Sequence, residues 1–152
     1  MTPSPFPPKT KEKNMTTHDV NTVFNDGMSF TAHINDHEIR MDTSTDDGGQ
    51  NSGPGPKRLM LASLAGCTGI DIVSLLNKMK VTFSDLSISV HAVLSNEHPK
   101  IYNMVKIRYT IKVAEEDKPK MIKAVNLSSE KYCGVFAMFS TFAKMDTEID
   151  YL

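Results

Sequence analysis

The sequence predicts an α+β fold, in which antiparallel sheets pack around one long helix. Apolar and polar residues alternate in two hairpin-like segments, which is the period of a half-buried strand. Between them, residues 59–79 are apolar on almost every side of a helix, which is typical of a buried helix. With 152 residues the chain has the length of about one domain. We expect residues 1–19 to be a disordered N-terminal extension and residues 20–152 to form that domain.

The first hairpin is predicted at residues 30–41, with its turn at Asn35–Asp36. Residues 42–55 follow and contain Gly48, Gly49 and the run Gly-Pro-Gly-Pro, so they are predicted to form a loop. Either an ordinary surface loop or a lid over a site would fit this composition.

The long helix is predicted to open near Pro56, whose fixed φ suits a first turn. One narrow stripe of this helix is not apolar, because small, polar and charged residues recur at steps of three and four. This stripe consists of Ser63, Cys67, Asp71, Ser74 and Lys78. It is either a solvent-facing edge or the floor of a cleft with Cys67 at its centre, and periodicity leaves both open.

The C-terminal half is predicted to contain a second hairpin, with strands at 86–94 and 101–113. Asp117 and Pro119 suit the start of a helix that carries an apolar face. Residues 135–142 are dense in large apolar side chains, and the chain ends in a strand at 144–152. That last strand has Asp146, Glu148 and Asp150 on one side.

Composition excludes several function classes. A net charge of −1 and a pI near 6.5 give no basic footprint for nucleic acid. The longest apolar run is too short to span a bilayer, and no secretory signal pattern is present, so we expect a cytoplasmic protein with no membrane partner. The chain contains no Cys-x-x-Cys, His-Glu-x-x-His or P-loop motif, so no metal and no cofactor are predicted.

The candidate catalytic residues are the two cysteines, Cys67 and Cys133, which lie 66 positions apart. A buried cysteine most often acts as a small apolar side chain. Two features favour a functional role instead. Gly66 and Gly69 permit close approach to Cys67, and Cys133 sits at a helix junction.

A reactive cysteine needs its thiolate form, which a nearby cation stabilises. Asp71, one helical turn after Cys67, would oppose ionisation. The cation would have to come from Lys57, Arg58, Arg40 or Lys131, and the sequence does not select among them.

Two motifs in order make the chain resemble a known family. Residues 53–71 read Gly-Pro-Gly-Pro-Lys-Arg-Leu-Met-Leu-Ala-Ser-Leu-Ala-Gly-Cys-Thr-Gly-Ile-Asp, and residues 131–135 read Lys-Tyr-Cys-Gly-Val. With the terminal amphipathic strand, they resemble the osmotically inducible protein C (OsmC) and organic hydroperoxide resistance (Ohr) family over residues 20–152. The closest likeness is to its OsmC-like branch.

The resemblance implies an intertwined homodimer, in which two sheets wrap around two central helices and the active sites lie at the subunit interface. It also implies that Cys67 is the peroxidatic residue, which attacks a small organic hydroperoxide. Cys133 would then be the resolving residue, and a dithiol reductant would restore both thiols. Such a protein serves in oxidative stress defence.

Two positions depart from the pattern of the well-characterised hydroperoxide reductases. Those proteins carry an Arg in the first hairpin turn and a Glu just after the proline that opens the long helix. The corresponding residues here are Asn25 and Lys57. Two alternatives to a peroxidase therefore stay open: a non-catalytic dimer that binds a small ligand, and a structural stress-associated dimer with inert cysteines.

Overall fold

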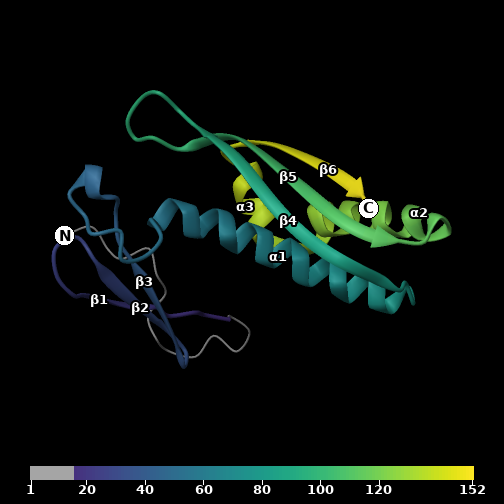
Figure 1. Cartoon of the computed structure of the whole chain (residues 1–152), viewed down its shortest axis with the longest axis horizontal. Helices are drawn as coiled ribbons and strands as arrows, with labels where there is room; N and C mark the ends of the chain where they lie inside the picture. Colours follow the sequence, from purple (N-terminus) through teal and green to yellow (C-terminus); the bar gives the residue numbers. More distant parts are fainter. Residues whose placement is uncertain (1–15) are drawn as a thin grey trace. The chain divides into compact units, whose positions relative to one another are not determined.

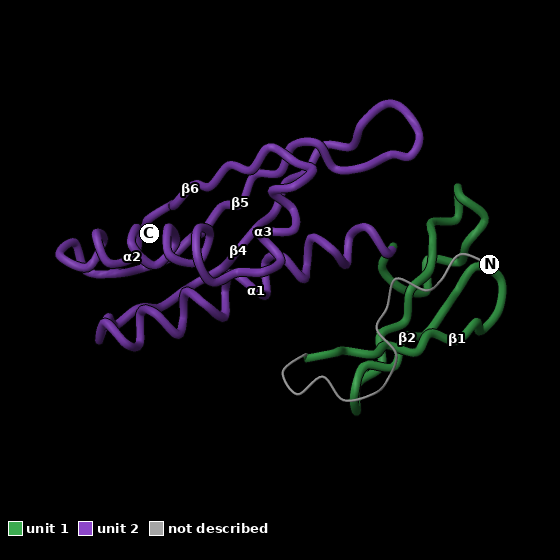
Figure 2. The backbone as a smooth tube through the Cα atoms, turned by 180° about the vertical axis from the view of Figure 1, so that it is seen from behind, with its two compact units in different colours: residues 1–55 green, residues 56–152 purple. Residues whose placement is uncertain are grey.

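The structure is a computed structural model that describes residues 16–152 (Figure 1). Most of the predicted N-terminal extension, residues 1–15, lies outside the described residues, and residues 16–20 have no regular secondary structure. The chain divides into two compact units, residues 1–55 and 56–152 (Figure 2). Each is described by itself below.

The N-terminal unit contains a three-stranded antiparallel sheet in the order β1-β2-β3. Its strands are β1 (Asn21–Phe24), β2 (Phe30–Ile34) and β3 (His37–Met41). The predicted hairpin is confirmed as β2 and β3, and Asn35 in its turn has φ 53°, a left-handed conformation that Asn tolerates. The sequence did not predict β1, which is short and has every residue exposed.

The loop after β3 is fastened by the buried side chain of Asp42. Its carboxylate accepts hydrogen bonds from the backbone N–H of Thr43 (2.8 Å), Gln50 (3.1 Å) and Ser52 (3.0 Å), and from the Ser52 hydroxyl (2.7 Å). These bonds, those to Ser52 above all, lower the pKa of Asp42 to about 2. Gly53 lies so close that a Cβ there would stand 2.4 Å from the Arg40 carbonyl oxygen. The loop is thus held against the end of β3.

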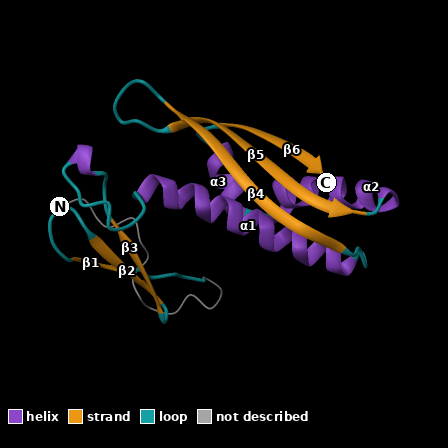
Figure 3. Cartoon of the chain, viewed as in Figure 1, coloured by secondary structure: helices purple, strands orange, loops and turns teal. Residues whose placement is uncertain are grey.

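The C-terminal unit places helices beneath a second three-stranded sheet, in the order β4-β5-β6 (Figure 3). Its elements are α1 (Pro56–Lys78), β4 (Phe83–Leu94), β5 (Tyr102–Val113), the 3-10 helix η2 (Glu115–Asp117), α2 (Lys118–Leu127), the π-helical η3 (Ser128–Tyr132), α3 (Gly134–Ser140) and β6 (Lys144–Tyr151). The predicted second hairpin is confirmed, since β4 and β5 pair antiparallel.

One expectation about the sheets is corrected: β6 runs parallel to β5, so this sheet is mixed rather than antiparallel. The chain leaves β5 and crosses over through α2, η3 and α3, so β6 starts at the same end as β5. Charge follows this register, because Lys106 pairs with Asp146 and Glu148, and Arg108 with Glu148 and Asp150.

The core of this unit forms where one face of α1 meets the sheet and α2. That face consists of Leu64, Thr68, Ile72 and Leu76, all fully buried. It packs with buried residues of β5, α2 and α3, among them Ile107, Tyr109, Ile111, Met121 and Phe139. Burying an apolar side chain of this size stabilises a fold by about 1.5–3 kcal/mol.

Other faces of α1 carry exposed apolar side chains. Met60 is 46% exposed and Ile70 is 73% exposed. The expectation that no segment is long enough to span a bilayer is corrected here, because by length and composition α1 could cross one, a property that core helices of water-soluble proteins share. An open, largely apolar groove of about 710 Å³ runs between α1 and β4, lined on the helix side by Ala65, Gly66, Gly69, Ile70, Val73, Ser74 and Asn77.

Candidate functional site

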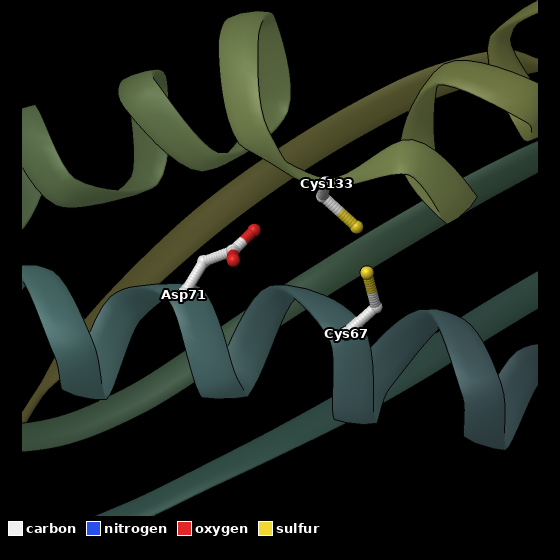
Figure 4. Close-up of side chains that lie close together, drawn as sticks. All are labelled: Cys67, Asp71 and Cys133. Carbon is white, nitrogen blue, oxygen red and sulfur yellow. The ribbon is translucent and has the colours of Figure 1, made fainter. Parts of the chain in front are cut away.

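The non-apolar stripe of α1 is divided between solvent and a covered centre. Ser63, Ser74 and Lys78 are exposed, whereas Cys67 and Asp71 are half-buried. The side chains of Cys67 and Asp71 point from α1 toward Cys133 on the segment above (Figure 4). The ends of the stripe are therefore a solvent-facing edge, and its middle lies beside Cys133; a cleft centred on Cys67 stays a prediction.

The two cysteines meet at this site. One ligand atom from each of Cys67, Asp71 and Cys133 lies within 4.8 Å of the other two. Both cysteines are free thiols, with Cys133 buried and Cys67 half-buried. The fold thus brings together two sulfur atoms that are 66 residues apart in the chain, with a carboxylate one helical turn from Cys67.

Local backbone geometry aims Cys133 at the helix. The π-helical η3 ends at Tyr132, and the Cys133 N–H closes it by donating to the Ser128 carbonyl at 2.8 Å. Cys133 itself is extended (φ −76°, ψ 99°) and is the N-cap of α3, where its sulfur accepts from the Phe136 N–H at 3.3 Å. Single turns of π-helix are frequent at functional sites.

Burial above all, together with the neighbouring Cys67 and the negative charge of Asp71, raises the pKa of the Cys133 thiol to about 11. The hydrogen bond from the Phe136 N–H acts in the opposite direction. None of the groups that act most strongly on Cys133 is a cation. Cys133 therefore keeps its proton at neutral pH, and the more exposed Cys67 is the thiol that a reagent reaches first.

A buried chain of hydroxyl groups leads to the Asp71 carboxylate of the site, and sequence reasoning missed it. Thr68 Oγ1 lies 2.8 Å from the Tyr109 hydroxyl and 3.0 Å from Ser128 Oγ. Ser128 in turn donates to Asp71 Oδ2 at 3.0 Å. The available signal was Thr68 itself, a hydrogen-bonding residue on the most apolar face of the helix.

The cations considered for Cys67 are engaged by other groups or are exposed. The Arg40 guanidinium hydrogen-bonds to Ser52 (3.0 Å) and Ser29 (3.1 Å) within the N-terminal unit. The Lys131 ammonium lies over the Tyr132 ring, 5.4 Å from its centroid. Lys57 and Arg58 are exposed in the first turn of α1.

Asn25 lies in the turn between β1 and β2. Its amide donates to Thr31 Oγ1 at 3.0 Å and to Ser29 Oγ at 3.3 Å. A neutral amide therefore stands at the position where the resemblance implies an Arg.

The C-terminal unit has a long helix beneath a sheet, with one thiol on the helix and a second thiol facing it from a helix junction. By fold and site, the chain is therefore an α+β protein with a pair of neighbouring cysteines. The sequence matches the family described as OsmC-like protein over residues 49–148. The chain belongs to the OsmC-like protein family.

The chain is also similar to a curated protein and to a solved structure. "Protein YhfA" of Escherichia coli K12 is 27% identical over 114 residues, which cover 74% of this chain and 82% of that protein. A hypothetical protein from Aquifex aeolicus has a TM-score of 0.79 and 27% identity, covering 91% of this chain and 98% of its own.

A more distant structure has the same fold. It is an organic hydroperoxide resistance protein OsmC from Legionella pneumophila, with a TM-score of 0.66 and 15% identity, covering 91% of this chain and 99% of that one.

Proposed function

We propose that this protein is a thiol-dependent organic hydroperoxide reductase that acts in oxidative stress defence. The observation that carries the proposal is the meeting of Cys67 and Cys133 at one site, with unequal exposure of the two thiols. A solved neighbour that bears the name of organic hydroperoxide resistance protein adds support from the family. The cytoplasm is the compartment we propose, because free thiols persist under its reducing conditions.

In the first step, the Cys67 thiolate attacks the outer oxygen of the hydroperoxide ROOH. The O–O bond breaks, the sulfur becomes a sulfenic acid, and the leaving alkoxide takes a proton and departs as the alcohol ROH. Cys67 suits this role because it is the more exposed of the two sulfurs and lies on a helix fixed by the core.

In the second step, the sulfur of Cys133 attacks the Cys67 sulfenic acid. The disulfide forms, and the proton of Cys133 leaves with the hydroxyl group as water. Cys133 suits this role because its sulfur lies beside that of Cys67, while its protonated, buried thiol does not attack the hydroperoxide itself. An external dithiol then reduces the disulfide by thiol–disulfide exchange and is itself oxidised to a disulfide.

We also propose that the protein works as a homodimer. The exposed Ile70 and the adjoining groove leave much apolar surface on α1, and soluble monomers rarely expose large apolar patches. Ala65 and Gly66 in that groove would let a second helix approach closely, whereas Gly69 already lies against Ile88 of β4. A second copy of this chain is the occupant that the family resemblance favours.

The raised Cys133 pKa favours one alternative function, a dimer whose thiols are inert. No cation is among the groups that act most strongly on Cys133, so the second step, in which Cys133 attacks, receives no electrostatic assistance from them. A protein of this kind would bind a small ligand or serve a structural role without consuming peroxide.

The test is consumption of cumene hydroperoxide with dithiothreitol as reductant. The wild type should consume it, Cys67→Ser should be inactive, and Cys133→Ser should accumulate a sulfenic acid that a dimedone-type probe traps at Cys67. Ser63→Ala, on the exposed end of the same stripe, is the matched control and should behave as the wild type. Normal turnover by Cys67→Ser would overturn the proposal, and normal turnover by Cys133→Ser would remove its resolving role.

A further inference from the structure

Two thiols and a carboxylate within 4.8 Å of one another have a second chemical capacity besides redox chemistry. We infer that Cys67, Cys133 and Asp71 form a binding site for a soft divalent metal ion, for which Zn²⁺ is the best match. The sequence predicted no metal because it contains no ligand motif, but these three donors come together only in space. Metal binding stands on the geometry alone. The consequence that the metal blocks peroxide reduction rests on the proposed function.

The distances suit a small tetrahedral ion. Zn²⁺ binds sulfur at about 2.3 Å and carboxylate oxygen at about 2.0–2.2 Å, which puts neighbouring ligands about 3.3–3.8 Å apart. The three donor atoms already lie within 4.8 Å, so side-chain movements of about 1 Å would close the site around the ion.

The donor set selects the class of metal. Thiolates are soft ligands that favour zinc and related ions, whereas Mg²⁺ and Ca²⁺ prefer sites made of oxygen. Two thiolates and one carboxylate bring three negative charges to a divalent cation. Binding therefore requires that both thiols release their protons to solvent.

An outer shell is already in place to orient the carboxylate. Ser128 donates to Asp71 Oδ2 at 3.0 Å, and Ser128 is itself 3.0 Å from Thr68 Oγ1, which lies 2.8 Å from the Tyr109 hydroxyl. Such outer partners fix a ligand's geometry and strengthen a metal site. Because Cys67 and Asp71 are only half-buried, one side of the site stays open for a water molecule as fourth ligand.

A metal at this site would compete with hydroperoxide for the same sulfur atoms. A Cys67 sulfur bound to zinc lacks a free thiolate for attack on the O–O bond, and a Cys67–Cys133 disulfide has no thiolate left for zinc. The reduced protein would bind the ion, and the oxidised protein would release it.

The direct test uses the reduced, tag-free wild type titrated with Co²⁺, whose thiolate complexes absorb by charge transfer in the near ultraviolet. Zn²⁺ affinity is then measured by competition with a chromogenic chelator. We expect one ion per chain, the charge-transfer band on Co²⁺ addition, and loss of that band when Zn²⁺ displaces Co²⁺.

The variants assign the ligands. Loss of an outer-shell partner costs about 10–100-fold in affinity, so Cys67→Ser and Cys133→Ser should each weaken Zn²⁺ binding by about 100-fold or more. Asp71→Asn should weaken it by about tenfold or more. Asp85→Asn is the matched control, because Asp85 is exposed and hydrogen-bonds to Ser84 instead, and its affinity should equal that of the wild type. Absence of the thiolate band in the wild type, or wild-type Zn²⁺ affinity in either Cys67→Ser or Cys133→Ser, would overturn the site.

A parallel assay separates this proposal from the function. Zn²⁺ added at saturation should stop hydroperoxide consumption by the wild type, and a chelator should restore it. Zinc binding without any peroxide consumption would support the metal site and contradict the proposed function. Peroxide consumption without a Co²⁺–thiolate band would support the proposed function and contradict the metal site.

Discussion

At the scale of single residues, Cys133 is a thiol held in its protonated form by its surroundings. Burial is the largest cause of its raised pKa, and the Cys67 sulfur and the Asp71 carboxylate add to it. Asp71 is also the acceptor at the end of the buried hydroxyl chain. The Asp71 carboxylate therefore acts on the Cys133 thiol and is itself hydrogen-bonded to the buried hydroxyl groups.

Replacing Asp71 by Asn should lower the pKa of Cys133, because it removes one negative charge that disfavours the thiolate. The comparison is between Cys67→Ser and Cys67→Ser/Asp71→Asn, so that Cys133 is the only thiol that titrates. Thiolate absorbance in the far ultraviolet follows the titration. An equal or higher pKa in the double variant would show that Asp71 does not act on Cys133.

Thr68→Val should destabilise the protein although the two side chains have nearly the same shape. The buried Tyr109 and Ser128 hydroxyls would each lose their partner on Thr68, and an unpaired buried polar group costs about 1–3 kcal/mol. Urea unfolding measures the change. Thr82→Val, at an exposed position, is the control, where surface substitutions usually stay within about 0.5 kcal/mol. Equal stability of the two variants would contradict the role of the hydroxyl chain.

At the scale of elements, one carboxylate fastens the loop after β3. The pKa of Asp42 lies at about 2 in the folded chain, below its ordinary value of 3.8. A lowered acid pKa stabilises the fold above the ordinary value, and the contribution is lost as the pH falls through about 2. As the pH falls from roughly 4 to 2, Asp42 should become protonated, and the hydrogen bonds that hold the loop after β3 should weaken.

The corresponding variant is Asp42→Asn, which removes the charge that accepts the four hydrogen bonds. Amide hydrogen exchange at Gln50 and Ser52 should accelerate near neutral pH, since both N–H groups lose a charged acceptor. Residues in β2 should keep their protection and serve as the internal reference. Unchanged exchange at Gln50 and Ser52 would show that the loop is held by other contacts.

Sequence periodicity predicted the elements better than their pairing. The alternation of apolar residues located β2 to β5 because a strand's faces repeat every second residue. It could not give the direction of β6, which depends on the crossover through α2, η3 and α3. The alternating cations of β5 and anions of β6 were a usable signal that the two strands are neighbours, since Lys106 and Arg108 face Asp146, Glu148 and Asp150, but this alternation does not depend on strand direction.

The sequence predicted the two cysteines of the candidate site but not the hydroxyl groups that hydrogen-bond to its carboxylate. Cys67 and Cys133 were identified from the motifs that contain them, and helical spacing put Asp71 beside Cys67. Thr68, Tyr109 and Ser128 come from three separate elements, and spacing within one element carries no information about such contacts. Which cation lies near the thiols likewise depends on the three-dimensional fold, and the spacing of residues in the sequence does not give it.

At the scale of the whole molecule, the exposed apolar face of α1 leads to a prediction about assembly. We expect a homodimer in sedimentation at micromolar concentration, with twice the 16.9 kDa mass of one chain. Ile70→Lys should shift the protein toward monomer, because a charge would stand on the proposed interface. Ile122→Lys, at an exposed position on α2, is the control and should leave the dimer intact. A folded monomer of about 17 kDa in the wild type would refute the assembly.

The central claim is that Cys67 and Cys133 form a redox pair, and intact-protein mass spectrometry tests it most directly. The reduced wild type is treated with a sub-stoichiometric amount of cumene hydroperoxide and measured without further reductant. The account predicts a species lighter by two hydrogen atoms, the mass of an internal disulfide, which neither Cys67→Ser nor Cys133→Ser should form. An unchanged wild-type mass, with the hydroperoxide left intact, would contradict the account and leave the inert-thiol dimer in its place.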